Sequence, residues 1–568
     1  MIIESSPITT SNKRTGSYAG FNRLIFRLPL PLILLVQAIS SLIALRNTAF
    51  QDEALYLFAG RQIFLSWLGK TPYLEPYGLY FSGYPSFYPV IGGVLDFLGG
   101  LEAARLFSLL CMLIVTTCVY CITIQFFDRK SALIAAFLFA CEGSVLFLGR
   151  LATYDAFCLC LLALATMLCL RASKAASAQI SLAVGPLLLL AVAAKYIGLL
   201  FVPTVLALFA WWCWKHKGLE EMFVRLGIAL FSLVVSAFIF FLNMDKQVLT
   251  GLSFTTTNRA SSGAMPIAVA QHIVMMEGIF LGLGLLGLLL CGRQRLPIGL
   301  LLFGSALLAP LYHIYKGEFV SLDKHLAFSM FFLAPLAGFA IAFCASLWRK
   351  RSVRSVRLSW ITVLVLCLLV FSLGLQQARN LYAGWPSSTQ LTAFLRPRVQ
   401  MGVGRYLAED YDVLRYNLKN ETALWQWSSL DYFVYTDKEN HTLSGEAAYN
   451  AAIQEGFFNL IELSYGYHTP LAIQIAQNLT ASKHYELIAR IPVHNSYGSG
   501  YFWVWGKHPT VSRSAENIVC RPEISTIRKY SSPIRSQLIF ACALLYTTNN
   551  EIVRRNHVLF YELAQSGA

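Results

Sequence analysis

Residues 47–64, NTAFQDEALYLFAGRQIF, follow the first long apolar segment of the chain and carry two adjacent carboxylates, Asp52 and Glu53. Because burying a charge is costly, this stretch belongs at the membrane surface. It is amphipathic, and it is too short and too polar to cross a bilayer. It therefore predicts a helix that lies in the membrane interface, within an unusually long first outer loop over residues 46–102.

The composition of the whole chain indicates a polytopic membrane protein. Of 568 residues, 56% are hydrophobic and only 13% are charged, and the mean hydropathy is +0.56. Such values exclude an ordinary soluble enzyme. The formal net charge of +15 does not indicate a nucleic-acid partner, because the basic residues cluster in short loops between apolar runs, as cytoplasmic anchors do. We therefore expect membrane lipids, and no nucleic acid, among the partners.

Apolar segments of about 20 residues, the length that a helix needs to cross the hydrocarbon, recur over much of the chain. Eleven transmembrane helices are predicted, near residues 28–45, 103–127, 131–149, 154–170, 178–194, 196–214, 222–243, 267–290, 296–313, 325–347 and 358–377. Every second loop is basic, which places the N-terminus in the cytoplasm. With an odd number of spans, the chain after about residue 378 lies outside. We expect an integral protein of the plasma membrane.

The predicted organisation has four parts. They are a cytoplasmic N-terminal segment (1–27), a transmembrane catalytic domain (28–377), an extracytoplasmic domain (378–508) and a tail of unknown structure (509–568). In the extracytoplasmic domain, four stretches have the composition of strands: TALWQWSSLDYFVYT (422–436), FFNLIELSYG (457–466), YELIARIPV (485–493) and GYFWVWGK (500–507). GEAAYNAAIQEG (445–456) and PLAIQIAQNLTASKHY (470–485) look helical, so we expect a small α/β domain.

The acid pair of the first loop is the first candidate for chemistry. A carboxylate held just outside the membrane, and protected from bulk water by an in-plane helix, can act as a general base. Asp52 is positioned for that role, and Glu53 could tune or orient it. The alternative is that both acids only stabilise the first turn of the interfacial helix, where negative charge is favoured.

Charged residues in two further loops favour the catalytic interpretation. The stretch GRLATYDAF puts Arg150 and Asp155 in a very short outer loop between two spans. The stretch AVAAKYIGLL puts Lys195 in apolar surroundings, where an unpaired ammonium group is costly and an anionic partner would offset the cost. That partner could be a ligand, or it could be Asp155.

One more outer loop adds cations. KGEFVSLDKHLAF brings Lys324 and His325 to the same side as the other candidates. Such cations suit a phosphate, since lysine acts as a compact point charge and arginine as a bidentate fork. A pairing of Lys324 with its neighbour Asp323 is the alternative.

These loops together resemble a known family. QDEALY in the long first loop, RLATYDA in the second, the AAKYIGLLFVP junction and the SLDKHLAF loop look like the GT-C membrane glycosyltransferases. Within that class the chain is similar to the protein O-mannosyltransferases and to the lipid A aminoarabinose transferase, over roughly residues 20–508. The resemblance implies transfer of a sugar from a polyprenyl-phosphate-linked donor to a glycan, lipid or protein acceptor on the outer face.

The resemblance also implies roles for individual residues. Asp52 matches the catalytic aspartate of the family and Glu53 its acidic neighbour. Asp155 matches the acid of the second outer loop, and Lys195 is a donor-phosphate contact. Charge and placement add three residues to the donor-phosphate site: Arg150, Lys324 and His325. Relatives differ on whether a divalent metal participates, and no residue here is assigned to a metal.

The leaving group determines the expected mechanism. A phosphate leaves without being protonated, so Asp52 alone can serve as the base while cations stabilise the developing charge on the phosphate. The expected reaction is a hexosyl or pentosyl transfer with inversion at the anomeric carbon. Two alternatives come from other classes: a secondary transporter, which would use a pathway open alternately to both sides, and a non-catalytic subunit of a cell-envelope assembly complex.

Overall fold

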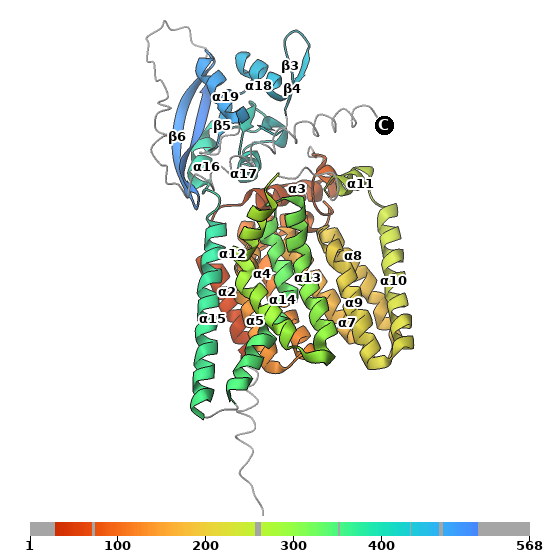
Figure 1. Ribbon diagram of the computed structural model, residues 1–568. Coiled ribbons are helices and arrows are strands. Elements are labelled where there is room, and N and C mark those ends of the chain that lie inside the picture. Colours follow the sequence, from red (N-terminus) through yellow and green to blue (C-terminus); the bar gives the residue numbers. More distant parts are fainter. Residues whose placement is uncertain are drawn as a thin grey trace, which may run out of the picture.

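The computed structural model describes residues 29–70, 74–255, 263–349, 353–431, 433–464 and 470–508. The predicted segments 1–27 and 509–568 lie outside the described residues. A bundle of long helices stands below a smaller domain that contains the strands (Figure 1). The predicted fold class, a helical polytopic membrane protein with a C-terminal α/β domain, is confirmed.

Eight helices among the described residues are long and apolar enough to cross a membrane. They are α4 (Tyr88–Phe126), α7 (Tyr154–Ala172), α9 (Gly198–Lys217), α10 (Leu219–Leu242), α12 (Pro266–Leu290), α13 (Gly292–Lys316), α14 (Leu322–Arg349) and α15 (Val353–Tyr382). The shorter helices of the bundle are α2 (Pro29–Ala44), α5 (Arg129–Cys141), α6 (Gly143–Leu148), η2 (Ala178–Ala183) and α8 (Val184–Ala194). Each of the eleven predicted spans coincides with helical structure, and the number of bilayer crossings stays a prediction.

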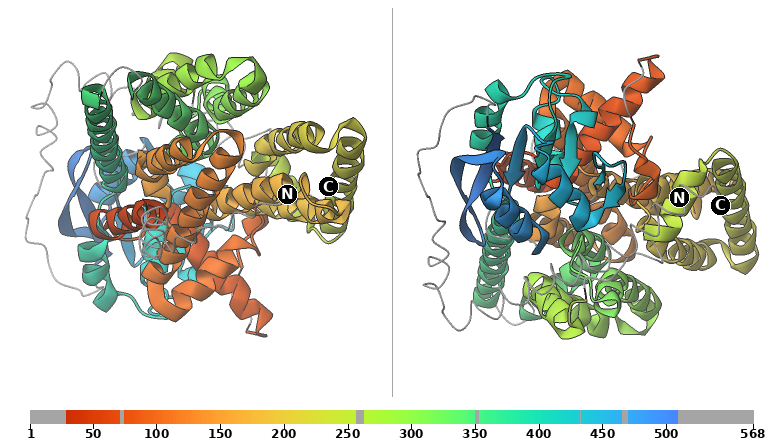
Figure 2. Two further views of the ribbon diagram at one scale, coloured as in Figure 1. Left: turned by 90° about the horizontal axis from the view of Figure 1, so that it is seen from below. Right: turned by 90° about the horizontal axis from the view of Figure 1, so that it is seen from above.

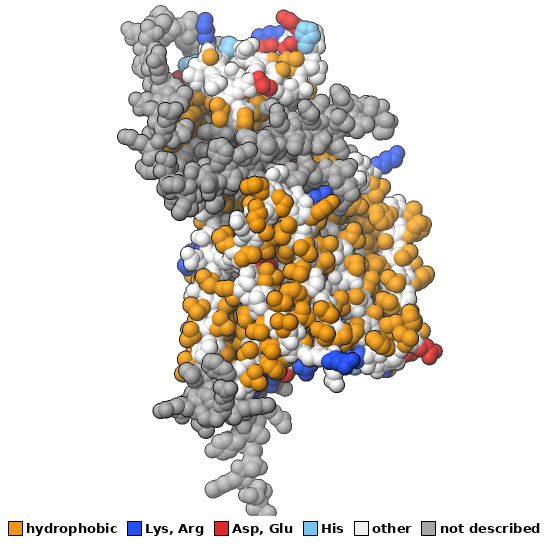
Figure 3. All heavy atoms as spheres, viewed as in Figure 1, with side chains coloured by type: hydrophobic (Ala, Val, Ile, Leu, Met, Phe, Trp, Pro, Cys, Tyr) orange, Lys and Arg blue, Asp and Glu red, His pale blue; other side chains and the backbone are white. Residues whose placement is uncertain are grey.

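The surface of the bundle suits a bilayer. On the face shown in Figure 3, hydrophobic side chains cover most of the bundle, and charged side chains lie mainly at its lower end and on the C-terminal domain. Seen from above, the C-terminal domain covers one part of the bundle and leaves α8, α9 and α10 to one side (Figure 2). Lipid tails cannot hydrate charged groups, so this distribution is the one that an integral membrane protein requires.

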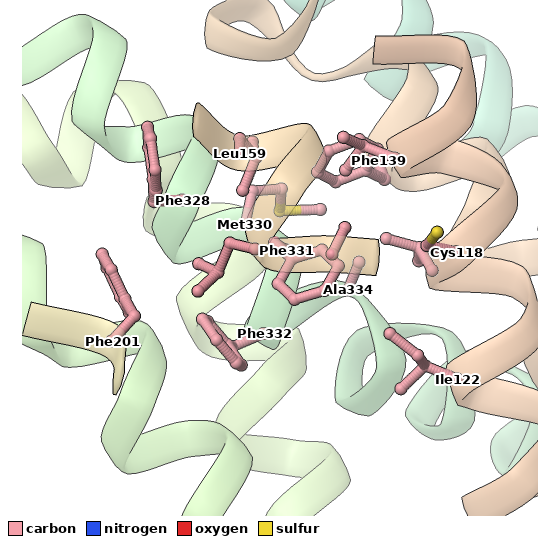
Figure 4. Packing of buried hydrophobic residues seen from close by; sticks show 14 of the residues in the cluster. Cys118, Ile122, Phe139, Leu159, Phe201, Phe328, Met330, Phe331, Phe332 and Ala334 are labelled. Atoms are coloured by element: carbon pink, nitrogen blue, oxygen red, sulfur yellow. The ribbon is translucent and has the colours of Figure 1, made fainter. Parts of the chain in front are cut away.

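Aromatic packing inside the bundle holds helices from distant parts of the chain together (Figure 4). The ring of Phe201 in α9 stacks on two rings of α14, with centroid distances of 5.7 Å to Phe328 and 5.5 Å to Phe332. Offset ring stacking adds to the stabilisation that burial provides. This packing fixes the start of α9 relative to the start of α14. Lys195 lies just before α9, and Lys324 lies in the first turn of α14.

The long first loop is largely helical. Helix α3 (Gln51–Trp67) lies across the end of the bundle that is beneath the C-terminal domain (Figure 1). We call this end of the bundle the domain face. The first part of α4 packs closely on α3, since a Cβ atom on Gly60 would lie 1.7 Å from the carbonyl oxygen of Pro89. Helix α4 then breaks at Gly100, whose φ of +69° and ψ of −172° belong to a region that is essentially restricted to glycine. The break separates the loop part of α4 from its apolar span.

The C-terminal domain is built on a mixed sheet with the strand order β2-β1-β5-β7-β6. Strand β1 is parallel to β2 and β5, whereas β7 is antiparallel to β5 and β6. The sheet contains β1 (Tyr406–Ala408), β2 (Trp427–Ser429), β5 (Leu460–Leu463), β6 (Tyr485–Asn495) and β7 (Gly498–Lys507), and β3 (Val434–Thr436) pairs with β4 (Thr442–Ser444). The helices are α16 (Thr389–Leu395), α17 (Tyr411–Asn417), α18 (Gly445–Gln454) and α19 (Pro470–Ala481). Among these elements, β1, β4, α16 and α17 were not predicted.

Helix α17 and the turn after it attach the C-terminal domain to the first loop. The carboxylate of Asp96, in the first part of α4, accepts hydrogen bonds from the Tyr416 hydroxyl (2.5 Å) and the Lys419 ammonium group (2.5 Å). The buried guanidinium of Arg415 donates to Glu75 at 2.7 Å. Buried charged groups need such partners, so these contacts determine how the domain sits on α3 and α4.

A carboxyl group in β5 and another just after β1 make the stability of the C-terminal domain pH-dependent. Asp410 follows β1, and Glu462 lies in β5 and accepts the Asp410 backbone N–H at 3.2 Å. Burial raises the pKa of Asp410 to about 6 and raises the pKa of Glu462 well above its usual value, because burial disfavours the charged form. The folded state then binds more protons than the unfolded state between about pH 4 and pH 6, so the stability from these groups falls as the pH rises through this window.

We therefore expect wild-type protein to lose stability, relative to Asp410→Asn, as the pH rises from about 4 to about 6. Denaturant titrations followed by tryptophan fluorescence give both free energies of unfolding at each pH. If the difference between the two free energies of unfolding stays constant from about pH 4 to about pH 6, the raised pKa of Asp410 is contradicted.

Candidate active site

Two lysine–carboxylate pairs meet at the domain face, where α3, α7 and α14 begin. The Nζ atom of Lys324 lies 2.5 Å from Oδ2 of Asp52, and Lys195 forms an ion pair with Asp155. The two pairs are coupled, since electrostatic interactions also link Lys324 with Asp155 and Lys195 with Asp52. We call these four residues the charged quartet. Its alternating charges offset part of the cost of removing each group from water.

Local structure explains how each member reaches the site. Asp52 and Asp155 are each the second residue of a helix, where the positive end of the helix dipole favours a carboxylate. Lys195 has an extended backbone, with φ −153° and ψ 133°, between α8 and α9. Lys324 is the third residue of α14, a position that disfavours a cation, so the Asp52 carboxylate compensates for it.

The members of the quartet differ in accessibility. The side chain of Asp52 is 29% exposed, whereas the values are 8% for Lys324, 3% for Lys195 and 0% for Asp155. A small molecule that enters the site from solvent therefore meets the Asp52 carboxylate first. The other acid and both lysines are held in fixed positions behind it.

Two tyrosines line the quartet. The Tyr56 hydroxyl donates to the Tyr154 hydroxyl at 2.6 Å, and Nζ of Lys195 lies 5.2 Å from the centre of the Tyr154 ring. Burial, with the nearby charge of Asp52, raises the pKa of Tyr56 well above its usual value, so this hydroxyl keeps its proton. Neither tyrosine was predicted, although Tyr56 lies one helical turn after Asp52 and so on the same face.

The structure places Glu53 outside the quartet. Its fully buried carboxylate accepts hydrogen bonds from Arg105 Nε (2.9 Å) and Nη2 (2.7 Å), and from the backbone N–H groups of Phe50 (2.8 Å) and Ala152 (2.7 Å). Through these contacts Glu53 joins the start of α3 to Ala152 in the second outer loop. Ala152 lies three residues before Asp155. The sequence analysis missed Arg105, although a charge at the start of a long apolar helix is a signal worth following.

Two other predicted donor-binding residues have partners away from the quartet. Arg150 pairs with Glu102 and donates to the Leu45 carbonyl oxygen at 3.3 Å. His325 Nδ1 lies 2.8 Å from His313 Nε2. These contacts give both side chains places in the packing of the bundle, and their roles in donor binding stay predictions.

The alternative pairings considered from the sequence have different outcomes. Lys195 does pair with the acid of the second loop. Lys324 pairs with Asp52 and not with its neighbour Asp323, whose carboxylate lies 2.7 Å from His272 Nε2. The acid of the first loop and the cation of the last outer loop therefore form one unit, across 272 positions of sequence.

The carboxylates of the quartet are already paired with cations. A divalent metal takes oxygen ligands, whereas each carboxylate of the quartet faces a lysine ammonium group. Within the described ranges, three potential metal ligands lie together at Asp437, Glu439 and His441, in the partly exposed turn between β3 and β4. The chemistry that the quartet supports is therefore proton transfer by a carboxylate beside fixed cations.

A helical bundle beneath an α/β domain is a fold that this protein shares with solved structures of membrane proteins. The structure is similar to the oligosaccharyltransferase of Archaeoglobus fulgidus in the apo form, with a TM-score of 0.54 and 14% identity over 78% of this chain and 70% of that chain. It is also similar to ArnT from Cupriavidus metallidurans bound to undecaprenyl phosphate, with a TM-score of 0.52 and 13% identity over 86% of this chain and 98% of that chain. No curated protein matches the sequence.

The sequence also matches a family model. The model describes dolichyl-phosphate-mannose-protein mannosyltransferases and covers residues 94–241, a range that includes Asp155 and Lys195. The predicted resemblance to the GT-C membrane glycosyltransferases is confirmed by this match and by the structural similarity.

Proposed function

We propose that the protein is an inverting glycosyltransferase that moves a sugar from a polyprenyl-phosphate-linked donor to an acceptor on the extracytoplasmic face of the membrane. The observation that carries the proposal is the charged quartet, which combines an accessible carboxylate with two buried ammonium groups on a GT-C fold. Two structures with this fold support the donor and the acceptor. One is ArnT bound to undecaprenyl phosphate, and the other is an oligosaccharyltransferase tethered with an acceptor peptide.

The reaction needs one base and one stabilised leaving group. Asp52 removes the proton of the acceptor hydroxyl, and the acceptor oxygen forms a bond to the anomeric carbon. The bond between that carbon and the phosphate oxygen breaks, and the polyprenyl phosphate leaves with the electron pair. A single displacement of this kind inverts the anomeric configuration, and no second carboxylic acid is needed because the phosphate is already a good leaving group.

The lysines serve the phosphate. A donor phosphate near Lys324 competes with Asp52 for the ammonium group, so donor binding both neutralises the phosphate and releases the carboxylate to act as a base. Lys195 adds a second positive charge that Asp155 holds in place. Fixed charges of this kind stabilise a transition state without reorganisation. The prenyl chain of the donor can stay in the bilayer while its head group reaches the domain face.

A panel of polyprenyl-phosphate sugars, incubated with the purified full-length protein, tests the proposal. Mass spectrometry that detects released polyprenyl phosphate together with a glycosylated acceptor would support it. Uptake of a solute by reconstituted vesicles without any glycosyl product would favour a transporter. Absence of both activities would favour a non-catalytic subunit.

Lys195→Met is expected to weaken the binding of undecaprenyl phosphate by about tenfold or more, the usual scale for losing a charged contact. The substitution also leaves the buried Asp155 carboxylate without its partner, so stability falls as well. The double variant Lys195→Met, Asp155→Asn removes both charges and separates the two effects. We expect it to recover stability and not affinity. Recovery of both would remove Lys195 from the donor site.

A further inference from the structure

The position of Lys195 depends on a break in the helical backbone. Helix α8 ends at Ala194 and α9 begins at Gly198, and Lys195 between them is extended. Such a break frees backbone groups that an unbroken helix would pair internally. In a membrane protein, unpaired backbone groups are expensive. Their new partners therefore decide where the extended residue stays.

A segment of the long first loop provides these partners. The Tyr84 N–H donates to the Ala193 carbonyl oxygen at 2.8 Å, and the Tyr196 N–H donates to the Ser82 carbonyl oxygen at 2.9 Å. The two hydrogen bonds flank Lys195 on both sides. Residues 82–84 thus lie alongside the break as a short backbone splint, more than 100 positions earlier in the sequence.

The middle residue of the splint must lack a side chain. A Cβ atom on the buried Gly83 would lie 2.3 Å from the carbonyl oxygen of Ala194 and 3.4 Å from the Cα atom of Lys195. The first distance is far inside van der Waals contact, and the atom it meets is backbone. Any side chain here would push the splint and the break apart.

We propose that residues 82–84 are a positioning element of the donor-phosphate site, with Gly83 the residue that lets the splint hold Lys195 in the quartet. The inference rests on the proposed function for the role of Lys195 and on backbone geometry for the role of Gly83. Gly83 touches no reacting group, and it acts through Lys195. A displacement of about 1 Å at an active site can cost about a hundredfold in rate, so a splint of this kind has a measurable effect.

Two assays on purified full-length Gly83→Ala test the inference. The first measures the rate at which acetic anhydride acetylates Lys195, by mass spectrometry of its peptide, because a buried and paired lysine reacts slowly. The second measures the affinity for undecaprenyl phosphate. Gly227→Ala is the matched control, since a Cβ atom on Gly227 meets nothing within 4 Å. We expect acetic anhydride to acetylate Lys195 faster in Gly83→Ala than in wild type. We also expect this variant to bind undecaprenyl phosphate about tenfold or more weakly. Gly227→Ala is expected to match wild type in both assays.

A double-mutant cycle distinguishes positioning from general damage. If Gly83 acts through Lys195, Gly83→Ala adds no further loss of affinity in a Lys195→Met background, whereas an unrelated structural defect adds its full effect. If Gly83→Ala does not fold, Tyr84→Pro removes one hydrogen bond of the splint, and Tyr84→Ala controls for the lost ring. We then expect faster acetylation of Lys195 in the proline variant than in the alanine variant.

The outcomes separate the inference from the proposed function. Unchanged acetylation of Lys195 in Gly83→Ala, or additive losses in the cycle, would overturn the positioning role. Faster acetylation with unchanged affinity would also overturn it, because the splint would then not serve the donor site. Wild-type protein that binds no undecaprenyl phosphate would instead refute the proposed function, and the acetylation rates would still report whether the splint holds Lys195.

Discussion

Asp52→Asn is expected to lower the rate of sugar transfer by about 10²–10⁴-fold, the range that a positioned general base contributes. Asparagine has nearly the same shape as aspartate, but its amide cannot take a proton from the acceptor hydroxyl. The side chain of Asp52 is partly exposed, so the fold does not depend on its burial. Lys324 keeps an anionic neighbour in Asp155. We therefore expect a folded, membrane-inserted protein that still binds the donor.

The measurement is the initial rate of glycosyl transfer by purified protein with the donor that the panel identifies. Asp128→Asn is the matched control. Asp128 is the N-cap of α5, where its carboxylate accepts the Lys130 and Ser131 N–H groups, and asparagine is an equally good N-cap. Near-normal turnover in Asp52→Asn would reject Asp52 as the base. Loss of turnover in both variants would indicate a general defect.

The sequence predicts which loops lie on the same side of the membrane as the site, because the excess of basic residues in cytoplasmic loops assigns a side to every loop. Basic residues alternate along the loops, so the side of the membrane follows for each loop. Asp52, Asp155, Lys195 and Lys324 all lie in or beside loops assigned to the same side. A common side is enough to predict that these groups can approach one another, and the structure brings these four residues together.

The partners within the site could not be predicted in the same way. Lys324 pairs with Asp52 because α14 and α3 meet at the domain face, and the relative position of such helices depends on packing such as that of Phe201 against Phe328. The spacing of apolar residues along a segment gives no information on contacts between helices that are far apart in the sequence. Strand β1 was missed because three residues are too short for an alternating pattern to be recognised. Arg105 was missed because a single charge in an apolar helix does not identify its partner.

Glu53→Gln is expected to destabilise the protein by about 3–5 kcal/mol, the usual cost of removing one partner from a buried ion pair. The guanidinium of Arg105 is almost completely buried, and Glu53 takes two of its hydrogen bonds. Glutamine keeps the volume of the side chain and removes the charge. Glu421→Gln is the matched control, because Glu421 pairs at 2.8 Å with Arg396, whose side chain is 56% exposed, and exposed pairs contribute about 0–1 kcal/mol.

The same pair decides between two roles for Glu53. If Glu53 tunes Asp52 chemically, Glu53→Gln should lose activity and keep its stability. If Glu53 and Arg105 hold the start of α3 against the second loop, stability and activity should fall together. The double variant Glu53→Gln, Arg105→Gln removes both buried charges, and neutral replacement of a buried pair is far less damaging than removal of one partner. We therefore expect unfolding in detergent titrations to show partial recovery in the double variant. If instead the double variant is as unstable as the sum of both single variants, the two side chains do not act as a unit.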